Sequence, residues 1–181
     1  MRSLALVLCF ALGGCVVSVQ PVVTAAGSSF DARLVGSWAA ADGKDRIVVS
    51  AGDDKVYAIE YTDSDGKVGH FQARLGHLGR RTVLDVQPAP RDSSPMPEGP
   101  LMIRGHLLFV VAVAGDTAKL EQLDPKALHA AIKSGAIAMA RFDDHDQLVL
   151  TGATAELQRV LAAYIERKGA LDDPSTWVRV R

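Results

Sequence analysis

The sequence predicts an α+β protein that is mainly β, in which a curled antiparallel sheet or a small barrel is joined by two late helices. Two observations support this fold class: short alternating runs of β-branched and aromatic residues separated by turns, and two amphipathic segments in the last third of the chain. The chain has 181 residues, of which 48% are hydrophobic, so it can bury one core but is short for two. We therefore expect a single globular domain over residues 31–181.

The first strands are expected between residues 34 and 79, where "AGDD" and "DSDG" separate runs rich in Val, Ile, Tyr and Phe. The dipeptide Asp65-Gly66 is a strong hairpin signal, because glycine adopts the positive φ that a tight turn needs. Alternation then assigns the two faces of the run around residue 72. The apolar face carries Phe71, Ala73 and Leu75, and the wet face carries His70, Gln72 and Arg74.

Further strands flank a proline-rich segment. The stretch "RTVLDVQPAP" predicts one strand, whereas residues 89–100 contain four prolines and are expected to form a long exposed loop. Residues 101–123 return as a hairpin that turns at Gly115-Asp116. The total is roughly eight strands, and an antiparallel sheet of that size tends to curl or close because closure removes its exposed edges.

Two helices are expected late in the chain. Asp124 supplies an N-cap oxygen and Pro125 a first-turn residue for a helix that ends at Gly135. A second helix has Thr154 as a candidate cap and Gly169 as its stop, with apolar residues at helical spacing between them. The intervening residues 136–152 predict a hairpin with "DDHD" at its tip.

The first fourteen residues have the pattern of an export signal. Arg2 precedes the apolar run "LALVLCFAL", which is too short to cross a bilayer because a spanning helix needs roughly 20 apolar residues. The formal charge of −1 shows no basic excess, so nucleic acid is not an expected partner.

The stretch Leu12-Gly13-Gly14-Cys15 resembles the lipobox of bacterial lipoproteins. This resemblance implies a signal peptide over residues 1–14, lipidation of Cys15 and attachment to a membrane through the acyl chains on Cys15. It places the protein in the bacterial cell envelope, and Val16 in place of an aspartate favours the outer membrane, facing the periplasm. The alternative is an ordinary secretory signal cut near Gly14 or within "VTAAG".

Residues 15–30 contain small and polar residues, one proline and no charge. This composition predicts a flexible tether, which in extended form would reach on the order of 50 Å. Such a tether would hold the domain clear of the lipid headgroups.

The start of the expected domain carries a second resemblance. Gly36-Ser37-Trp38 is similar to the glycine-x-tryptophan motif that opens lipocalin-type barrels, in which the tryptophan closes one end. The arrangement of Gly36, Trp38, Asp65-Gly66, Phe71, Leu75 and Leu84-Asp85 also resembles an uncharacterised family of bacterial lipoproteins, which implies no reaction. The alternative for Trp38 is simple packing in a core.

Five residues are candidates to line a ligand site on such a body: Trp38, His70, Gln72, Arg74 and His106. They favour a non-catalytic binding or assembly module that contacts a small apolar ligand or an envelope protein. The wet strand face carrying three of these residues has an alternative interpretation, since it could simply coat the exterior.

The sequence supports a catalytic function less well than a binding function. No nucleophile elbow, phosphate loop or paired zinc motif occurs, so no catalytic residue, metal ligand or cofactor is assigned. The alternative function is an envelope hydrolase whose metal is held by histidines distant in sequence, namely His70, His77 and His106. The "DDHD" stretch, residues 143–146, is interpreted as a solvated turn.

Overall fold

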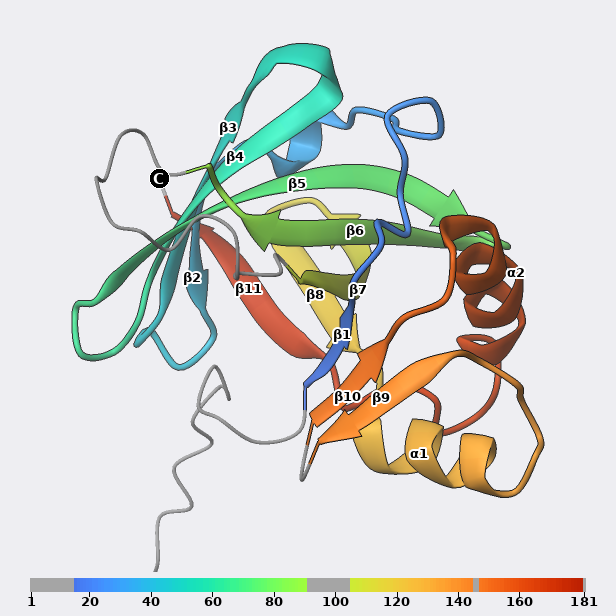
Figure 1. The fold of residues 1–181 in the computed structure, drawn as a ribbon. Helices are drawn as coiled ribbons and strands as arrows, with labels where there is room; N and C mark the ends of the chain where they lie inside the picture. Colours follow the sequence, from blue (N-terminus) through green and yellow to red (C-terminus); the bar gives the residue numbers. More distant parts are fainter. Residues whose placement is uncertain (1–14, 91–104, 145–146, 181) are drawn as a thin grey trace, which may run out of the picture.

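The computed structural model describes residues 15–90, 105–144 and 147–180, and its main body is a closed eight-stranded antiparallel barrel (Figure 1). The barrel strands are β2 (Gly36–Ala40), β3 (Arg46–Ala51), β4 (Val56–Thr62), β5 (Val68–Leu78), β6 (Arg81–Pro88), β7 (His106–Ala114), β8 (Thr117–Gln122) and β11 (Ser175–Val180). Strands β2 to β8 pair in sequence order, and β11 lies between β8 and β2. The predicted small barrel is confirmed.

The barrel interior is filled by side chains from alternate positions of the strands. Its two clusters of buried residues contain Trp38, Tyr61, Ala118 and Trp177 in one, and Leu34, Tyr57, Ala73, Leu75, Leu84, Val86 and Val111 in the other. Eight strands enclose a space just wide enough for such packing. The predicted apolar face of β5 therefore points into the barrel, and its wet face points outward.

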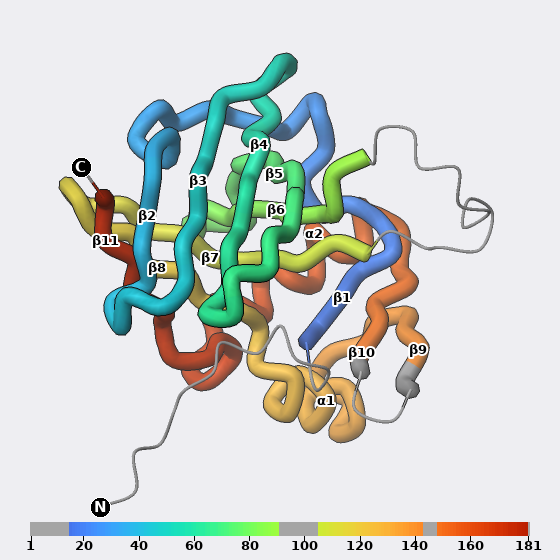
Figure 2. Tube along the Cα trace, turned by 90° about the vertical axis from the view of Figure 1, so that its left-hand side faces the viewer, coloured from blue at the N-terminus to red at the C-terminus, as the bar shows by residue number. Residues whose placement is uncertain are grey.

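A third cluster lies outside the barrel, where two helices and three strands cover the outer face of β5 to β7. The covering elements are β1 (Val16–Ser18), α1 (Pro125–Lys133), β9 (Arg141–Asp144), β10 (Gln147–Leu150) and α2 (Thr154–Tyr164). Figures 1 and 2 both place them on the side of the barrel away from β3. Strand β1 pairs antiparallel with β7 and parallel with β10, so it joins the β9–β10 hairpin to the barrel.

Both late helices are confirmed, and one cap differs from the prediction. Asp124 caps α1, since its Oδ1 accepts a hydrogen bond from the backbone N–H of Ala127 at 2.9 Å. Helix α2 has Ala153 at its N-cap position, with no side-chain cap. The hydroxyl of Thr154 instead donates to the backbone oxygen of Pro21 at 2.8 Å, so it holds the N-terminal segment rather than its own helix.

The N-terminal segment is packed into the domain, which differs from the flexible tether predicted over residues 15–30. Val16, Val22 and Val23 are buried in the outer core, and Val22 is only 1% exposed. The Gln158 amide donates to the backbone oxygen of Val22 at 2.9 Å. Composition suggested a tether because the segment lacks charge, but its valines supply apolar area that the outer face of the barrel needs to bury.

The remaining predicted features are either seen or fall outside the described residues. The Asp65-Gly66 turn is present, with Gly66 at a φ of 79°, and the β9–β10 hairpin is present as well. Most of the proline loop lies in residues 91–104, and the side chains of the "DDHD" stretch are outside the described part too. Among the described helices, none is long and apolar enough to span a bilayer.

Candidate functional site

A pocket of about 360 Å³ lies on the outer wall of the barrel, between β5 to β7 and the N-terminal segment around residues 21–25. It lies on the wet face of β5 that alternation predicted. Its polar wall is formed by Thr24, Gln72, Arg74, Asp85, Gln87 and His106. Because these side chains come from four separate stretches of chain, the pocket exists only in the folded protein.

Strand register explains how the wall is assembled. Gln72 of β5 lies opposite Gln87 of β6, and Arg74 lies opposite Asp85, so both pairs project from the same outer face. His106 begins β7, in the part of the strand that runs beside the end of β6. The outward polar side chains of β5 and β6 therefore lie side by side and face the N-terminal segment across the pocket.

Asp85 is a buried carboxylate whose hydrogen bonds fix the position of the segment above the pocket. Its side chain is 3% exposed, and Oδ2 accepts from the backbone N–H groups of Val22 at 2.6 Å and Val23 at 2.8 Å. The remaining oxygen, Oδ1, lies 2.7 Å from Nδ1 of His106. Burial of a charge is tolerated when it is paired and hydrogen-bonded, and three donors meet this condition.

The contact with Asp85 fixes the orientation of the His106 ring. A carboxylate only accepts hydrogen bonds, so Nδ1 carries the hydrogen and Nε2 of the neutral ring is an acceptor. His106 makes no other hydrogen bond within the described chain, where no buried side-chain nitrogen or oxygen lacks a partner. The imidazole lines the pocket, and within the described residues Nε2 is not used by another hydrogen bond.

Arg74 is held by a turn on the rim of the pocket. Its Nη1 donates to the backbone oxygen of Asp54 at 2.9 Å and lies 3.5 Å from the accepting Oγ of Ser28. Asp54 and Lys55 have left-handed backbones, with φ of 51° and 60°, a conformation that is uncommon for residues other than glycine. The Lys55 amino group donates to the backbone oxygen of Ser28 at 3.1 Å, which ties the same turn to the N-terminal segment.

The two glutamines supply hydrogen-bonding groups to the pocket wall. Neither Gln72 nor Gln87 makes a side-chain hydrogen bond within the part of the chain that the structure describes. Each amide offers two N–H donors and one acceptor oxygen to the pocket. The wall therefore combines a cation, two amides and an imidazole acceptor, which suits a small polar ligand.

Three of the five candidate ligand-lining residues, Gln72, Arg74 and His106, lie together in this pocket. Trp38 does not line this pocket. Its ring is buried inside the barrel, and its Nε1 donates to the backbone oxygen of Leu34 at 2.9 Å. His70 lies near the start of β5 with its side chain 66% exposed, 4.0 Å from Glu60 Oε2.

Asp85, Gln87 and Thr24 belong to the pocket but were not predicted. The sequence did contain a signal for the first two, because Asp85 and Gln87 alternate with apolar residues in "VLDVQP" and share a strand face. Thr24 carried no signal, since its segment was expected to be a tether. Only the tertiary fold brings this segment to the strands.

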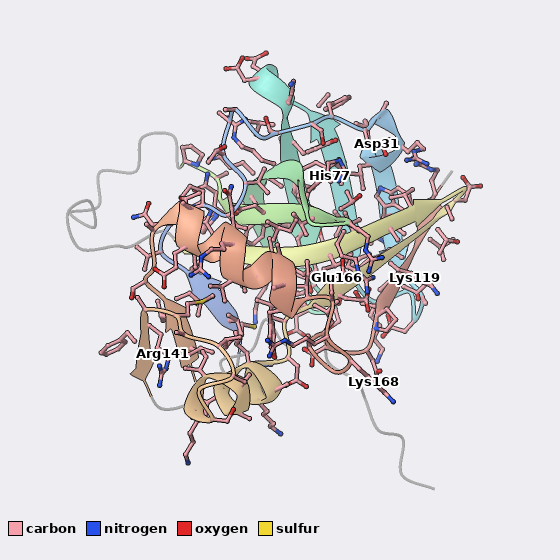
Figure 3. All side chains as sticks on the ribbon, turned by 90° about the vertical axis from the view of Figure 1, so that its right-hand side faces the viewer. Asp31, His77, Lys119, Arg141, Glu166 and Lys168 are labelled. Carbon is pink, nitrogen blue, oxygen red and sulfur yellow. The ribbon has the colours of Figure 1, made fainter. Side chains whose placement is uncertain are left out.

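The three histidines of the metal hypothesis do not form a common site. His77 lies near the end of β5, where its side chain is exposed, and His70 lies near the strand's other end. Within residues 15–90, 105–144 and 147–180, no group of three His, Cys, Asp or Glu side chains is placed to hold a metal ion. Figure 3 shows His77 apart from Arg141, which lies on β9.

No protein-family model matches the chain, and neither a curated protein nor a solved structure matches it.

Proposed function

We propose that this protein is a lipid-anchored lipoprotein of the bacterial cell envelope that acts as a non-catalytic binding module. The outer-wall pocket is its ligand site, and Cys15 is its site of lipidation. The protein is held at the outer membrane, facing the periplasm. We also propose that the barrel is lipocalin-like, on the basis of the resemblance at Gly36-Ser37-Trp38.

The single observation that carries the binding role is the polar wall of the pocket. Gln72, Arg74 and His106 come from strands β5 and β7, and they line one concave site of about 360 Å³. Ligand sites in proteins are concave and contain a few polar groups that fix the ligand's orientation. The unengaged amides favour a polar ligand over the small apolar ligand that the sequence suggested.

The anchor rests on the lipobox resemblance. Cys15 is half-buried and immediately precedes β1, so acyl chains on its sulfur would hold the domain close to the headgroups. Two or three acyl chains make a durable anchor, whereas one gives only marginal binding.

The anchor is tested by the intact mass of the protein purified from bacterial membranes. We expect a chain that starts at Cys15 and carries acyl chains, and a Cys15→Ser variant that leaves the washed membrane fraction. Retention of the Cys15→Ser variant in that fraction would overturn the anchor.

Binding is tested by native mass spectrometry of the purified chain incubated with a small-molecule extract of the bacterial envelope. We expect a retained small molecule that is lost in a Gln72→Leu, Gln87→Leu double variant and kept in an Arg80→Gln variant, whose side chain is 88% exposed outside the pocket. Equal retention by the double variant would exclude the pocket as the site.

A hydrolase is the second candidate, and the Asp85–His106 pair is the observation that favours it. A carboxylate that orients an imidazole, with Nε2 open to a pocket, is the arrangement of a general base. Within the described residues no three ligands are placed to hold a metal, so we expect the purified protein to contain no stoichiometric zinc, which metal analysis tests. Stoichiometric zinc that is lost on His106→Ala would favour the hydrolase over the binding module.

A further inference from the structure

Among the residues that the structure describes, Arg74 has no carboxylate partner. Several other arginines of the described chain do have carboxylate partners: Arg33 lies 2.6 Å from Asp31, and Arg80 lies 3.4 Å from Glu166. Arg74 faces only a backbone oxygen and a hydroxyl, both through Nη1, although it lies half-buried in a pocket. A guanidinium in such a place is available to an anion from outside the chain.

The geometry of Arg74 leaves its forked edge open. Nη1 uses its two hydrogens on Asp54 and Ser28, while Nε and Nη2 make no hydrogen bond within the described residues. The Nε–Nη2 edge presents two parallel N–H groups, which match the two oxygens of a carboxylate. A lone hydroxyl or a carbonyl would use only one of them.

The guanidinium is held in place before any ligand arrives. The left-handed backbone of Asp54 and Lys55 aims the Asp54 oxygen at Nη1, and Lys55 fixes the turn to Ser28. Holding a flexible side chain in its bound position reduces the entropy lost on binding. Strained backbone of this kind is found at ligand clamps.

Asp85 lies opposite Arg74 across the β5–β6 pair, and its negative charge is engaged by other donors. Both of its oxygens are occupied, by the N–H groups of Val22 and Val23 and by the ring of His106. Donors around a carboxylate compensate its charge locally. The exposed chemistry of the wall is therefore cationic at Arg74 and neutral at the two glutamines.

We propose that the outer-wall pocket binds a small carboxylate, with the Nε–Nη2 edge of Arg74 receiving both carboxylate oxygens and the amides of Gln72 and Gln87 contacting neighbouring amide or hydroxyl groups of the ligand. This inference rests on the proposed binding function and adds to it the chemical class of the ligand. A carboxylate of this kind occurs at the end of a short peptide or on a sugar acid.

The test is calorimetric titration of the purified mature chain in detergent with two acids, an N-acetylated dipeptide with a free carboxyl end and glucuronate. Each has a neutral counterpart, the dipeptide amide and glucose. We expect at least one acid to bind at least about tenfold more tightly than its counterpart, since the neutral counterpart cannot form charge-assisted hydrogen bonds with Arg74. The acid that binds identifies a peptide end or a sugar acid as the source. Failure of both acids, or equal binding of a neutral counterpart, would overturn the proposal.

Variants assign the effect to this site. Arg74→Lys keeps the charge but loses the fork, so we expect a loss of about fivefold or more in affinity for the bound acid. Because Arg74 also holds the turn at Asp54, a Gln87→Glu variant gives an independent measure: it adds a repelling charge to the wall and leaves the Arg74 contacts intact. Arg80→Gln is the matched control and is expected to bind normally. Unchanged affinity in Gln87→Glu would contradict the proposed site.

The same titration distinguishes failure of the ligand class from failure of the proposed function. A Cys15→Ser chain is titrated alongside the mature chain, and we expect equal affinity because Cys15 does not line the pocket. Suppose that the neutral probes bind as tightly as the acids and that their binding is lost in the Gln72→Leu, Gln87→Leu variant. This result would support the proposed binding function and contradict the proposal that the ligand is a carboxylate.

Discussion

Arg179 lies over the face of Trp38, with its guanidinium carbon 4.3 Å from the centre of the indole ring. Its Nη1 donates to the backbone oxygen of Val35 at 2.8 Å, and its Nη2 donates to that of Arg33 at 2.6 Å. One side chain of strand β11 therefore covers the tryptophan ring. It also donates hydrogen bonds to backbone oxygens at the end of the short 3-10 helix Ala32–Leu34. This arrangement joins the two ends of the barrel sequence.

We expect Arg179→Met to lower the free energy of unfolding by about 2–3 kcal/mol, since it removes a cation–π contact and two hydrogen bonds to a charged donor. Urea unfolding followed by tryptophan fluorescence measures the change. Arg80→Met is the matched control, because its side chain is 88% exposed and surface ion pairs contribute little. A loss no larger than that of the control would show that the contact with Trp38 does not stabilise the barrel.

Gly36 leaves room for this guanidinium. Its φ is 137°, and a Cβ at this position would meet Nη1 of Arg179. We expect Gly36→Ala to destabilise the barrel through both the backbone strain and the displaced guanidinium. In an Arg179→Met background only the strain remains, so the cost of Gly36→Ala should shrink. A double-mutant cycle from urea unfolding tests this, and strictly additive costs would contradict it.

Asp85 is expected to hold the N-terminal segment against the barrel. Asp85→Asn removes one of the two acceptor oxygens that serve Val22, Val23 and His106, so we expect a loss of about 1–3 kcal/mol. Amide hydrogen exchange should rise at residues 19–25 more than in the barrel strands. Asp65→Asn is the control, because its side chain is 72% exposed in a hairpin turn. Protected Val22 and Val23 amides in Asp85→Asn would show that other contacts suffice.

The chain's three tyrosines make its stability sensitive to alkaline pH. Burial raises the pKa of Tyr57, Tyr61 and Tyr164, and for Tyr61 the nearby negative charge of Asp45 adds to the effect. The unfolded chain releases these protons near the ordinary pKa of about 10. The stabilisation is therefore fully present below pH about 10 and is lost as the pH rises through the folded pKa values.

The measurement is the tyrosinate absorbance of the folded chain against pH, compared with the same chain in denaturant. We expect the folded curve to lie at higher pH and the free energy of unfolding to fall above pH about 10. Tyr61→Phe should remove part of that fall. Coincident titration curves, with native circular dichroism throughout, would contradict the burial argument.

Much of the barrel was predictable because local signals agree with it. Asp65-Gly66 marks its turn, and the alternation around Gln72 places apolar side chains inside and polar ones outside. The same alternation predicted that Gln72 and Arg74 share a wet face, on which the pocket was then found.

Other features could not be predicted because they depend on contacts between distant segments. Residues 15–30 have the composition of a linker, yet Val22 is buried by contacts with α2 and the outer wall of the barrel. Whether His106 lies near Asp85 depends on the register of β6 against β7, which no local pattern specifies.

The position of β11 has a consequence for biogenesis. The ring of strands is completed only when residues 175–180 insert between β8 and β2, so β2 keeps an unpaired edge while the intervening helices are being made. Such an edge invites pairing with other chains. A chaperone that covers the open edge of β2 until residues 175–180 are available would therefore favour correct closure of the barrel.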